Sequence, residues 1–144
     1  MKRSNVLLAV LSASGGQPFQ PVQIQKAMFL VCENLPGLVT EGPNYNFAPY
    51  DYGPFDSTVY NDARVLQAAG LARIADASNG RWSTYSATDH GLERATEILD
   101  GMTKGQRKYI LDVAAWVRKL SFSALVKSIY DAYPQMRARS IFEG

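Results

Sequence analysis

The sequence predicts a mainly α-helical protein with a small β-hairpin, and three observations lead to this fold class. Apolar residues recur three or four positions apart in several stretches, which is the spacing of a buried helix face. The pair Asn79-Gly80 separates two stretches of alternating polarity, and Asn-Gly favours the tight turn of a hairpin. With 144 residues, of which 47% are hydrophobic and 19% charged, the chain is long enough for one folded domain with its own core.

Two short helices are expected first, over residues 4–12 and 21–34. In the first, one helical stripe is formed by Val6, Leu7, Val10 and Leu11. A Gly-Gly-Gln-Pro segment then ends the helix. Pro21 follows at a position where a helix accepts a proline, in its first turn.

An aromatic-rich segment, residues 41–53, comes next and predicts an extended piece or a short strand that ends in a turn. Its tyrosines and its phenylalanine alternate with Asn, Asp, Pro and Gly. Tyr45 and Tyr50 fit either the core or a protein interface, because tyrosine combines contact area with a polar tip. The aromatic residues expected in the core are Phe47, Tyr52 and Phe55.

A third helix is expected to open at Gly53-Pro54 and to end at Gly70. Its apolar residues recur at spacings of four, four, three and three, which describes one buried stripe. They are Phe55, Val59, Ala63, Leu66 and Ala69.

A hairpin is predicted after this helix, with strands over residues 71–76 and 81–87 joined at Asn79-Gly80. Thr88 is a suitable N-cap for a fourth helix over residues 89–99. A winged helix-turn-helix domain has the same order of elements: helix, helix, extended piece, helix, hairpin and helix. We assign this domain to the first hundred residues.

Residues 101–144 are predicted as a helical extension that packs on the winged helix and forms one globular unit with it. The first of its two helices covers residues 103–120. The second is capped by Ser121 or Ser123 and ended by Pro134.

Charge is distributed unevenly between these two parts. The whole chain has 15 Lys+Arg and 13 Asp+Glu, a net charge of +2. Residues 1–100 carry 7 basic and 10 acidic side chains, a net of −3, whereas residues 101–144 carry 8 basic and 3 acidic ones, a net of +5. Nucleic acid bound by this protein would therefore meet its basic charge mainly in the C-terminal helices.

Several classes of protein are disfavoured by what the sequence lacks. One cysteine, Cys32, and one histidine, His90, leave no disulfide, no cysteine-based zinc site and no multi-histidine metal site. No apolar run approaches the roughly 20 residues that span a bilayer. Phosphate-loop and nucleophile-elbow motifs are absent, and Asp51 has no second carboxylate or histidine placed near it. We expect a cytoplasmic protein without cofactor or metal that is not an enzyme.

Three local patterns resemble those of the Panacea or SocA-like proteins and of winged-helix regulators. Residues 24–30, Ile-Gln-Lys-Ala-Met-Phe-Leu, look like the "LQKLLY"-type second helix of the SocA-like family. Residues 50–55, Tyr-Asp-Tyr-Gly-Pro-Phe, with Tyr60 and Leu66, resemble that family's "GP…VY…L" third helix. Residues 85–91, Tyr-Ser-Ala-Thr-Asp-His-Gly, are similar to the exit from the wing of many winged-helix regulators, and residues 130–134 with Ser140 resemble the ending of small prokaryotic winged-helix proteins.

This resemblance implies two functions. SocA-like proteins are associated with toxin–antitoxin pairs, in which they neutralise a toxin by binding it or present it to a protease. Other winged helices of this shape are transcription factors. Our first expectation is therefore a DNA-binding regulator, with an antitoxin-like role within that class. The alternative is an adaptor that binds a toxin or another effector protein, and the negative charge of residues 1–100 favours this alternative.

Candidate nucleic-acid contacts follow from the winged-helix interpretation. The outward face of the third helix offers groups that hydrogen-bond base edges and phosphates, although Asp56 and Asp62 on the same helix would repel phosphate. Arginines beside the hairpin turn could enter a minor groove. Cations in the first turns of the fifth helix oppose the helix dipole, which favours an anionic partner. The candidates are Ser57, Thr58, Asn61, Arg64, Arg73, Arg81, Lys104, Arg107 and Lys108.

Each group also has a purely structural interpretation. The third helix could present an ordinary solvated face, Arg81 could simply neighbour a core Trp82, and the basic fifth helix could serve solubility. The expected partners are duplex DNA or a protein, with no membrane. A homodimer is expected in the DNA-binding case, because one recognition helix covers a single half-site.

Overall fold

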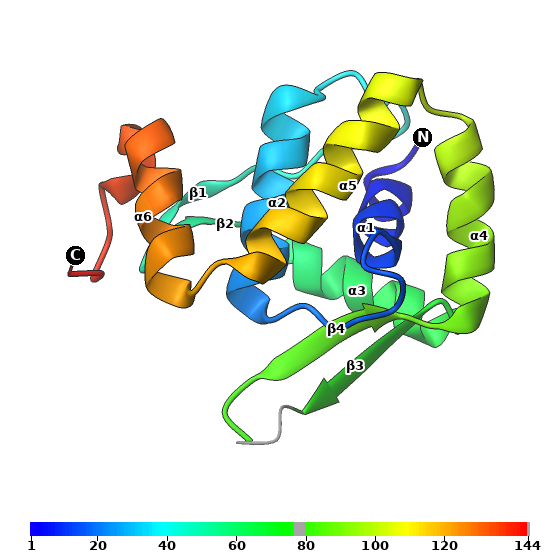
Figure 1. The fold of residues 1–144 in the computed structure, drawn as a ribbon, viewed down its shortest axis with the longest axis horizontal. Coiled ribbons are helices and arrows are strands. Elements are labelled where there is room, and N and C mark those ends of the chain that lie inside the picture. The colour runs from blue at the N-terminus through cyan, green and yellow to red at the C-terminus, as the bar shows by residue number, and fades with distance from the viewer. Residues whose placement is uncertain (77–79, 144) are drawn as a thin grey trace.

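The computed structural model describes residues 1–76 and 80–143. Its mainly helical architecture with a small β-hairpin confirms the predicted fold class. Figure 1 shows the arrangement of the elements. They are α1 (Arg3–Ser12), α2 (Pro21–Asn34), β1 (Ala48–Tyr50), β2 (Gly53–Phe55), α3 (Thr58–Ala68), β3 (Ala72–Asp76), β4 (Ser83–Ala87), α4 (Asp89–Asp100), α5 (Lys104–Lys119), α6 (Phe122–Ala132) and a 3₁₀ turn, η1 (Pro134–Arg137).

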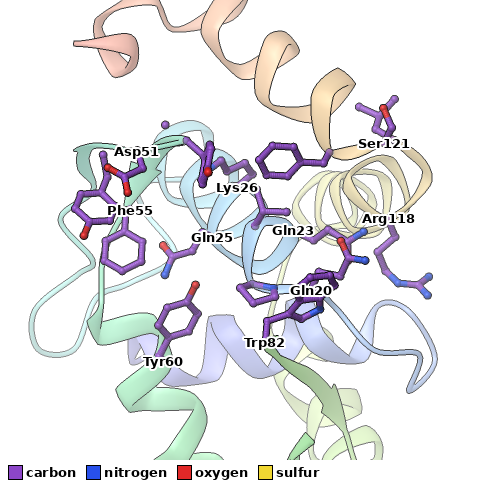
Figure 2. A pocket seen from close by; sticks show the side chains of 17 residues that line it. Gln20, Gln23, Gln25, Lys26, Asp51, Phe55, Tyr60, Trp82, Arg118 and Ser121 are labelled. Atoms are coloured by element: carbon purple, nitrogen blue, oxygen red, sulfur yellow. The ribbon is translucent and has the colours of Figure 1, made fainter. Parts of the chain in front are cut away.

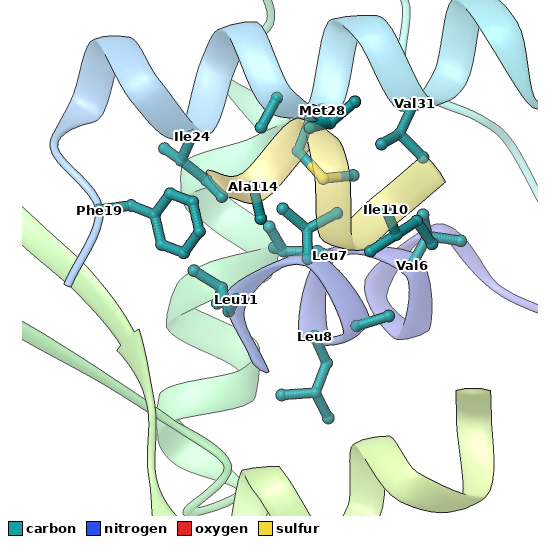
Figure 3. Close-up of a cluster of buried hydrophobic side chains, with 14 of the residues drawn as sticks. Val6, Leu7, Leu8, Leu11, Phe19, Ile24, Met28, Val31, Ile110 and Ala114 are labelled. Carbon is teal, nitrogen blue, oxygen red and sulfur yellow. The ribbon is translucent and has the colours of Figure 1, made fainter. Parts of the chain in front are cut away.

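Helix α1 forms the centre of the core. Every residue from Val6 to Leu11 is buried, and a helix that is apolar on all sides belongs in a protein interior. It packs against α2, α3, α4, α5 and β4. Figure 3 shows Leu7 and Leu11 beside Ile24 and Met28 of α2, with Ile110 of α5 close by. The helix that begins the chain thereby joins the N-terminal elements to α5.

Helix ends are defined by capping side chains. The hydroxyl of Thr88 accepts a hydrogen bond from the Gly91 amide, which confirms its predicted role at the start of α4. The hydroxyl of Ser121, not that of Ser123, accepts from the Ala124 amide and begins α6. Thr103 begins α5 in a capping box.

The start of the third helix differs from the prediction. Gly53-Pro54 does not open α3; it belongs to β2, which pairs with β1 so that Tyr50 lies opposite Gly53. Gly53 has φ +106°, a value that a helix does not allow and that glycine adopts without strain. Helix α3 begins at Thr58, whose amide donates to the Asp56 carboxylate at 2.9 Å.

The second hairpin agrees with the prediction in its paired strands. Ala72 lies opposite Ala87 and Asp76 opposite Ser83, in antiparallel register. Strand β4 is also bridged to Phe19, because the backbone groups of Tyr85 and Phe19 exchange two hydrogen bonds. The predicted Asn79-Gly80 turn includes Asn79, which lies outside the described residues.

The C-terminal elements pack against the first part of the chain. Helix α5 lies on α2 and α1, and α6 contacts α2 and β2. The segment after η1 returns to the β1–β2 turn, where the amide of Ile141 and the hydroxyl of Ser140 both donate to the backbone oxygen of Asp51. Among the described residues, no helix has the length and apolar character needed to cross a membrane.

Candidate functional site

The predicted face of α3 is present, but most of its polar groups are engaged within the chain. Asn61 and Arg64 are exposed, and the Arg64 guanidinium donates a hydrogen bond to the Asn61 side chain. The hydroxyl of Thr58 donates to Asp56 at 2.6 Å. Ser57 is exposed at the start of the helix, without a side-chain cap bond. The predicted inward residues Val59, Ala63 and Leu66 are buried.

The two carboxylates that counted against phosphate binding both have internal partners. Asp62 accepts from Arg3 Nε at 2.9 Å and from the Tyr45 hydroxyl at 2.7 Å. Burial, and then the bond to Asp62, raise the pKa of Tyr45 above its usual range. Burial alone would raise the pKa of Asp56, but hydrogen bonds from Thr58 and Asn46 outweigh it, so that pKa lies below its usual value.

The hairpin arginines lie on the same side of the molecule as α3. Helix α3 packs against β3, and Figure 1 shows the hairpin running beneath it. Arg73 is exposed on β3 opposite Ser86, and Arg81 is exposed just before β4. Arg73 and Arg81, with Arg64 of α3, are the three arginines of the predicted set that lie on α3 and the adjoining hairpin.

The basic start of α5 lies elsewhere. Figure 1 places this end of α5 at the opposite end of the molecule from the β3–β4 hairpin. Lys104 is exposed there, whereas Lys108 pairs with Asp112 at 2.6 Å. Arg107 donates to the backbone oxygens of Leu99 and Met102, and it thereby satisfies carbonyls at the end of α4. The nine predicted contacts therefore do not form one surface.

A pocket of about 740 Å³ lies on another part of the molecule. Five segments that are distant in sequence enclose it: the first half of α2, the β1–β2 turn, Tyr60 of α3, Trp82 before β4, and the α5–α6 junction (Figure 2). Its lining residues are Gln20, Pro21, Val22, Gln23, Gln25, Lys26, Tyr50, Asp51, Tyr52, Gly53, Phe55, Tyr60, Trp82, Arg118, Leu120, Ser121 and Phe122.

Exposed aromatic side chains are concentrated around this pocket. Seven large hydrophobic residues are exposed in the described part of the chain, and four of them line the pocket. These four are Tyr50, Tyr52, Trp82 and Phe122, with exposed fractions of 45%, 41%, 38% and 41%. The rings of Tyr52 and Phe122 meet edge to face at 5.0 Å, which joins the β1–β2 turn to α6.

Lys26 is the unusual polar residue of the pocket. Its exposed fraction is 3%, and in the described part of the chain it forms no ion pair. Its ammonium donates one long hydrogen bond, 3.4 Å to the backbone oxygen of Pro54. Burial lowers the pKa of Lys26 to about 7.

Gln25 fixes the wall beside Lys26. Its amide nitrogen donates to the backbone oxygen of Asp56 at 2.9 Å, and its amide oxygen accepts from the Asp56 amide at 3.0 Å. This pair of bonds fastens α2 to the segment between β2 and α3. The part of α2 that carries Lys26 is therefore held against residue Asp56 by two hydrogen bonds.

Sequence reasoning missed this pocket, although it singled out part of its rim. Tyr52 was expected in the core and is exposed, because its ring projects from the β1–β2 turn toward Phe122. Tyr45 and Tyr50 each fit either the core or an interface by sequence; in the structure Tyr45 is buried and Tyr50 is exposed. The signal available in the sequence was the polar pair Gln25-Lys26 within an otherwise apolar stretch of α2.

A metal-binding cluster is absent from the described residues, and the single cysteine and single histidine lie apart from the pocket. No group of three or more His, Cys, Asp or Glu side chains that could hold a metal ion is found among the residues that the structure describes. Burial, followed by the charges of Asp56 and Glu33, raises the pKa of Cys32 to about 12, which leaves the thiol protonated and unreactive. His90 is exposed in the first turn of α4.

In comparisons with known proteins, neither a protein-family model nor a curated protein matches the chain.

Proposed function

We propose that this protein is a non-catalytic protein-interaction module that binds a partner protein over the pocket between α2 and the β1–β2 turn. The observation that carries the proposal is the gathering of four exposed aromatic rings around one pocket. Aromatic residues supply much of the binding energy of protein interfaces, where they enter or surround well-packed pockets. The partner is a protein that inserts an apolar side chain between these rings.

The resemblance to SocA-like proteins suggests the kind of partner. A toxin or another effector protein bound in this way would be neutralised or delivered without chemistry on the part of this chain. No metal-holding cluster is found among the described residues, which is compatible with that role. The cytoplasm is the compartment that we propose for it. Charge also favours a protein partner, because residues 1–100 carry a net charge of −3.

The test is co-purification with the product of the adjacent gene. The expected result is a complex that survives high salt, because its contacts are mainly apolar. Tyr52→Ser and Trp82→Ser should each weaken the complex by about tenfold or more. Val65→Ser is the matched control, since Val65 is 62% exposed on α3 and does not line the pocket.

Two results would contradict the proposal. One is a complex that Val65→Ser weakens as much as Tyr52→Ser does. The other is a complex that forms but is insensitive to both pocket variants. In either case the partner would bind a different surface.

DNA binding is a second candidate, favoured by one specific observation. The carboxylates of Asp56 and Asp62 are turned to internal partners, which leaves Asn61 and Arg64 exposed beside the hairpin. A homodimer would then present two such faces to two half-sites. Duplex binding at low salt that falls steeply with added salt, and that Arg64→Glu reduces, would support this candidate. Absence of duplex binding at low salt would eliminate it.

A further inference from the structure

We propose that the pocket also binds a small apolar carboxylic acid, whose carboxylate pairs with the ammonium of Lys26 while its apolar part lies among the aromatic rings. The proposal deepens the proposed function by naming an effector for the same pocket. It concerns the isolated chain, however, and needs no partner protein to be tested.

The first support is the missing counter-charge of Lys26. Lys26 has an exposed fraction of 3%, and an ammonium on a side chain buried to this extent needs an anion or several acceptors to offset its desolvation. In the described part of the chain Lys26 has one long bond to the backbone oxygen of Pro54 and no carboxylate partner. A ligand carboxylate entering the pocket would supply the absent charge.

The second support is the packing of the β1–β2 turn over this side chain. A Cβ at Gly53 would lie 3.5 Å from Lys26 Cε, 3.6 Å from its Nζ and 3.3 Å from Tyr130 Cε1. The glycine thus lets the turn approach Lys26 and Tyr130 closely. The Tyr130 hydroxyl is itself buried without a hydrogen-bond partner in the described part of the chain. Gly53 therefore lies between this hydroxyl-bearing ring and Lys26, whose ammonium has one long hydrogen bond.

The volume of the pocket and its lining side chains indicate the size and the apolar character of the rest of the ligand. About 740 Å³ falls within the range of small-molecule sites, roughly 300–1,000 Å³. Rings from Phe55, Tyr60 and Trp82 line the pocket on the sides away from Lys26 (Figure 2). Planar or extended apolar groups fit among such rings, since aromatic side chains bury large areas and favour stacked or edge contacts.

The other ionisable groups at the pocket favour a single negative charge on the ligand. Asp51 lines the rim at the β1–β2 turn and would repel a second carboxylate. Arg118, on the opposite wall, donates to the backbone oxygen of Pro18 and lies over the Phe19 ring. Burial raises the pKa of Tyr60 to about 12, so its hydroxyl is neutral at the pH values of interest. A monocarboxylic acid is therefore the class of ligand we infer.

Protonation of Lys26 gives the binding a characteristic pH dependence. Burial lowers its pKa to about 7, so the free pocket loses the ammonium as pH rises above that value. A bound carboxylate favours the charged form and raises the pKa. Binding should therefore weaken as pH rises above about 7, and binding at higher pH should take up a proton.

The experiment is calorimetric titration of the full chain with 3-phenylpropanoate and with its neutral analogue 3-phenylpropanamide. At about pH 6 the acid should bind at least about tenfold more tightly than the amide. At about pH 8.5 the preference for the acid should shrink, and the heat should depend on the ionisation enthalpy of the buffer. Lys26→Met should bind acid and amide equally, whereas Lys127→Met, at an exposed lysine paired with Asp131, should behave as the unmodified chain does.

Equal affinity for acid and amide in the unmodified chain would overturn the proposal, as would an acid preference that survives in Lys26→Met. The acid–amide comparison requires no variant and therefore stands even if Lys26→Met folds poorly. Because no partner protein is present, failure here leaves the co-purification test unaffected. The co-purification test with Tyr52→Ser contains no carboxylic acid, so its result does not depend on the calorimetric one.

Discussion

Two surfaces of this molecule differ in how far their polar groups are satisfied by the chain itself. On the α3 face, Arg64 is bonded to Asn61, and Asp62 is bonded to Arg3 and Tyr45. At the pocket, Lys26 is buried with one long hydrogen bond. A group that already has partners gains little from a ligand, whereas a buried group without them gains much. A ligand that supplies a partner for Lys26 should therefore gain more binding free energy at the pocket than a ligand gains on the α3 face.

The two surfaces also differ in how the chain builds them. The α3 face comes from one helix and the neighbouring hairpin, so its residues are close in sequence. The pocket requires α2, the β1–β2 turn and the α5–α6 junction to come together. The bonds from Ser140 and Ile141 to Asp51 fasten the end of the chain to that turn. Substitutions in the C-terminal segment should therefore alter ligand binding at the pocket. They should leave the arrangement of side chains on α3 unchanged.

The largest effect is expected from Lys26→Met, which removes the buried ammonium and keeps a side chain of similar length. At about pH 6 the free energy of unfolding should rise by about 2–4 kcal/mol, because the desolvation cost disappears. In the unmodified chain this cost is fully present below about pH 7, and it declines as pH rises toward 10.5, since the unfolded lysine then binds the proton that the folded one has lost.

Urea unfolding at several pH values measures this difference. Stability of the unmodified chain should increase between about pH 7 and 10 relative to that of Lys26→Met. Lys127→Met is the control and should change stability by less than about 0.5 kcal/mol, because its ion pair is exposed. Parallel pH profiles for the unmodified chain and Lys26→Met would show that Lys26 is not desolvated.

A smaller effect is expected from Gly53→Ala, which places a methyl group against Lys26 and Tyr130. The loss should be about 2–3 kcal/mol, since backbone strain at φ +106° adds to close contacts. Gly42→Ala is the matched control: Gly42 has φ +76° with open space around it, and its loss should be about 1 kcal/mol. Thermal and urea unfolding compare the two, and equal losses would mean that the turn is not closely packed over Lys26.

The smallest effect is expected on the α3 face. Arg64→Ala removes an exposed side chain whose hydrogen bond is to exposed Asn61, so stability should change by less than about 0.5 kcal/mol. Partner binding at the pocket should be unaltered. A change of more than about 1 kcal/mol in urea unfolding would instead assign Arg64 a structural role that its exposure does not suggest.

Much of the fold follows from local sequence rules. Residues 21–34 form the predicted helix, because Pro21 suits a first turn and the apolar stripe continues to its end. Thr88 caps α4 as its type and position indicate. The third helix was predicted too early because Gly-Pro before an apolar stripe resembles a helix start. In the structure Gly53 pairs with Tyr50 across the β1–β2 hairpin, so Gly53-Pro54 forms a strand and the helix begins later.

The pocket could not be predicted in the same way. Lys26 lies in α2 among apolar residues, and nothing near it in sequence shows that residues 50–55 and 118–122 enclose it. The position of Tyr52 likewise depends on Phe122, which lies 70 residues later in the chain. Periodicity places a side chain on one face of its own element, but it cannot state which distant element covers that face.

An NMR map of the complex with the adjacent gene's product would compare the two surfaces most directly. Signals of Tyr50, Tyr52, Phe122 and the Trp82 indole should shift on addition of that protein, while those of Asn61, Arg64 and Arg73 should stay in place. The opposite pattern, with shifts confined to α3 and the β3–β4 hairpin, would contradict the assignment of the pocket as the functional surface. The same pattern produced by duplex DNA at low salt would favour DNA binding instead.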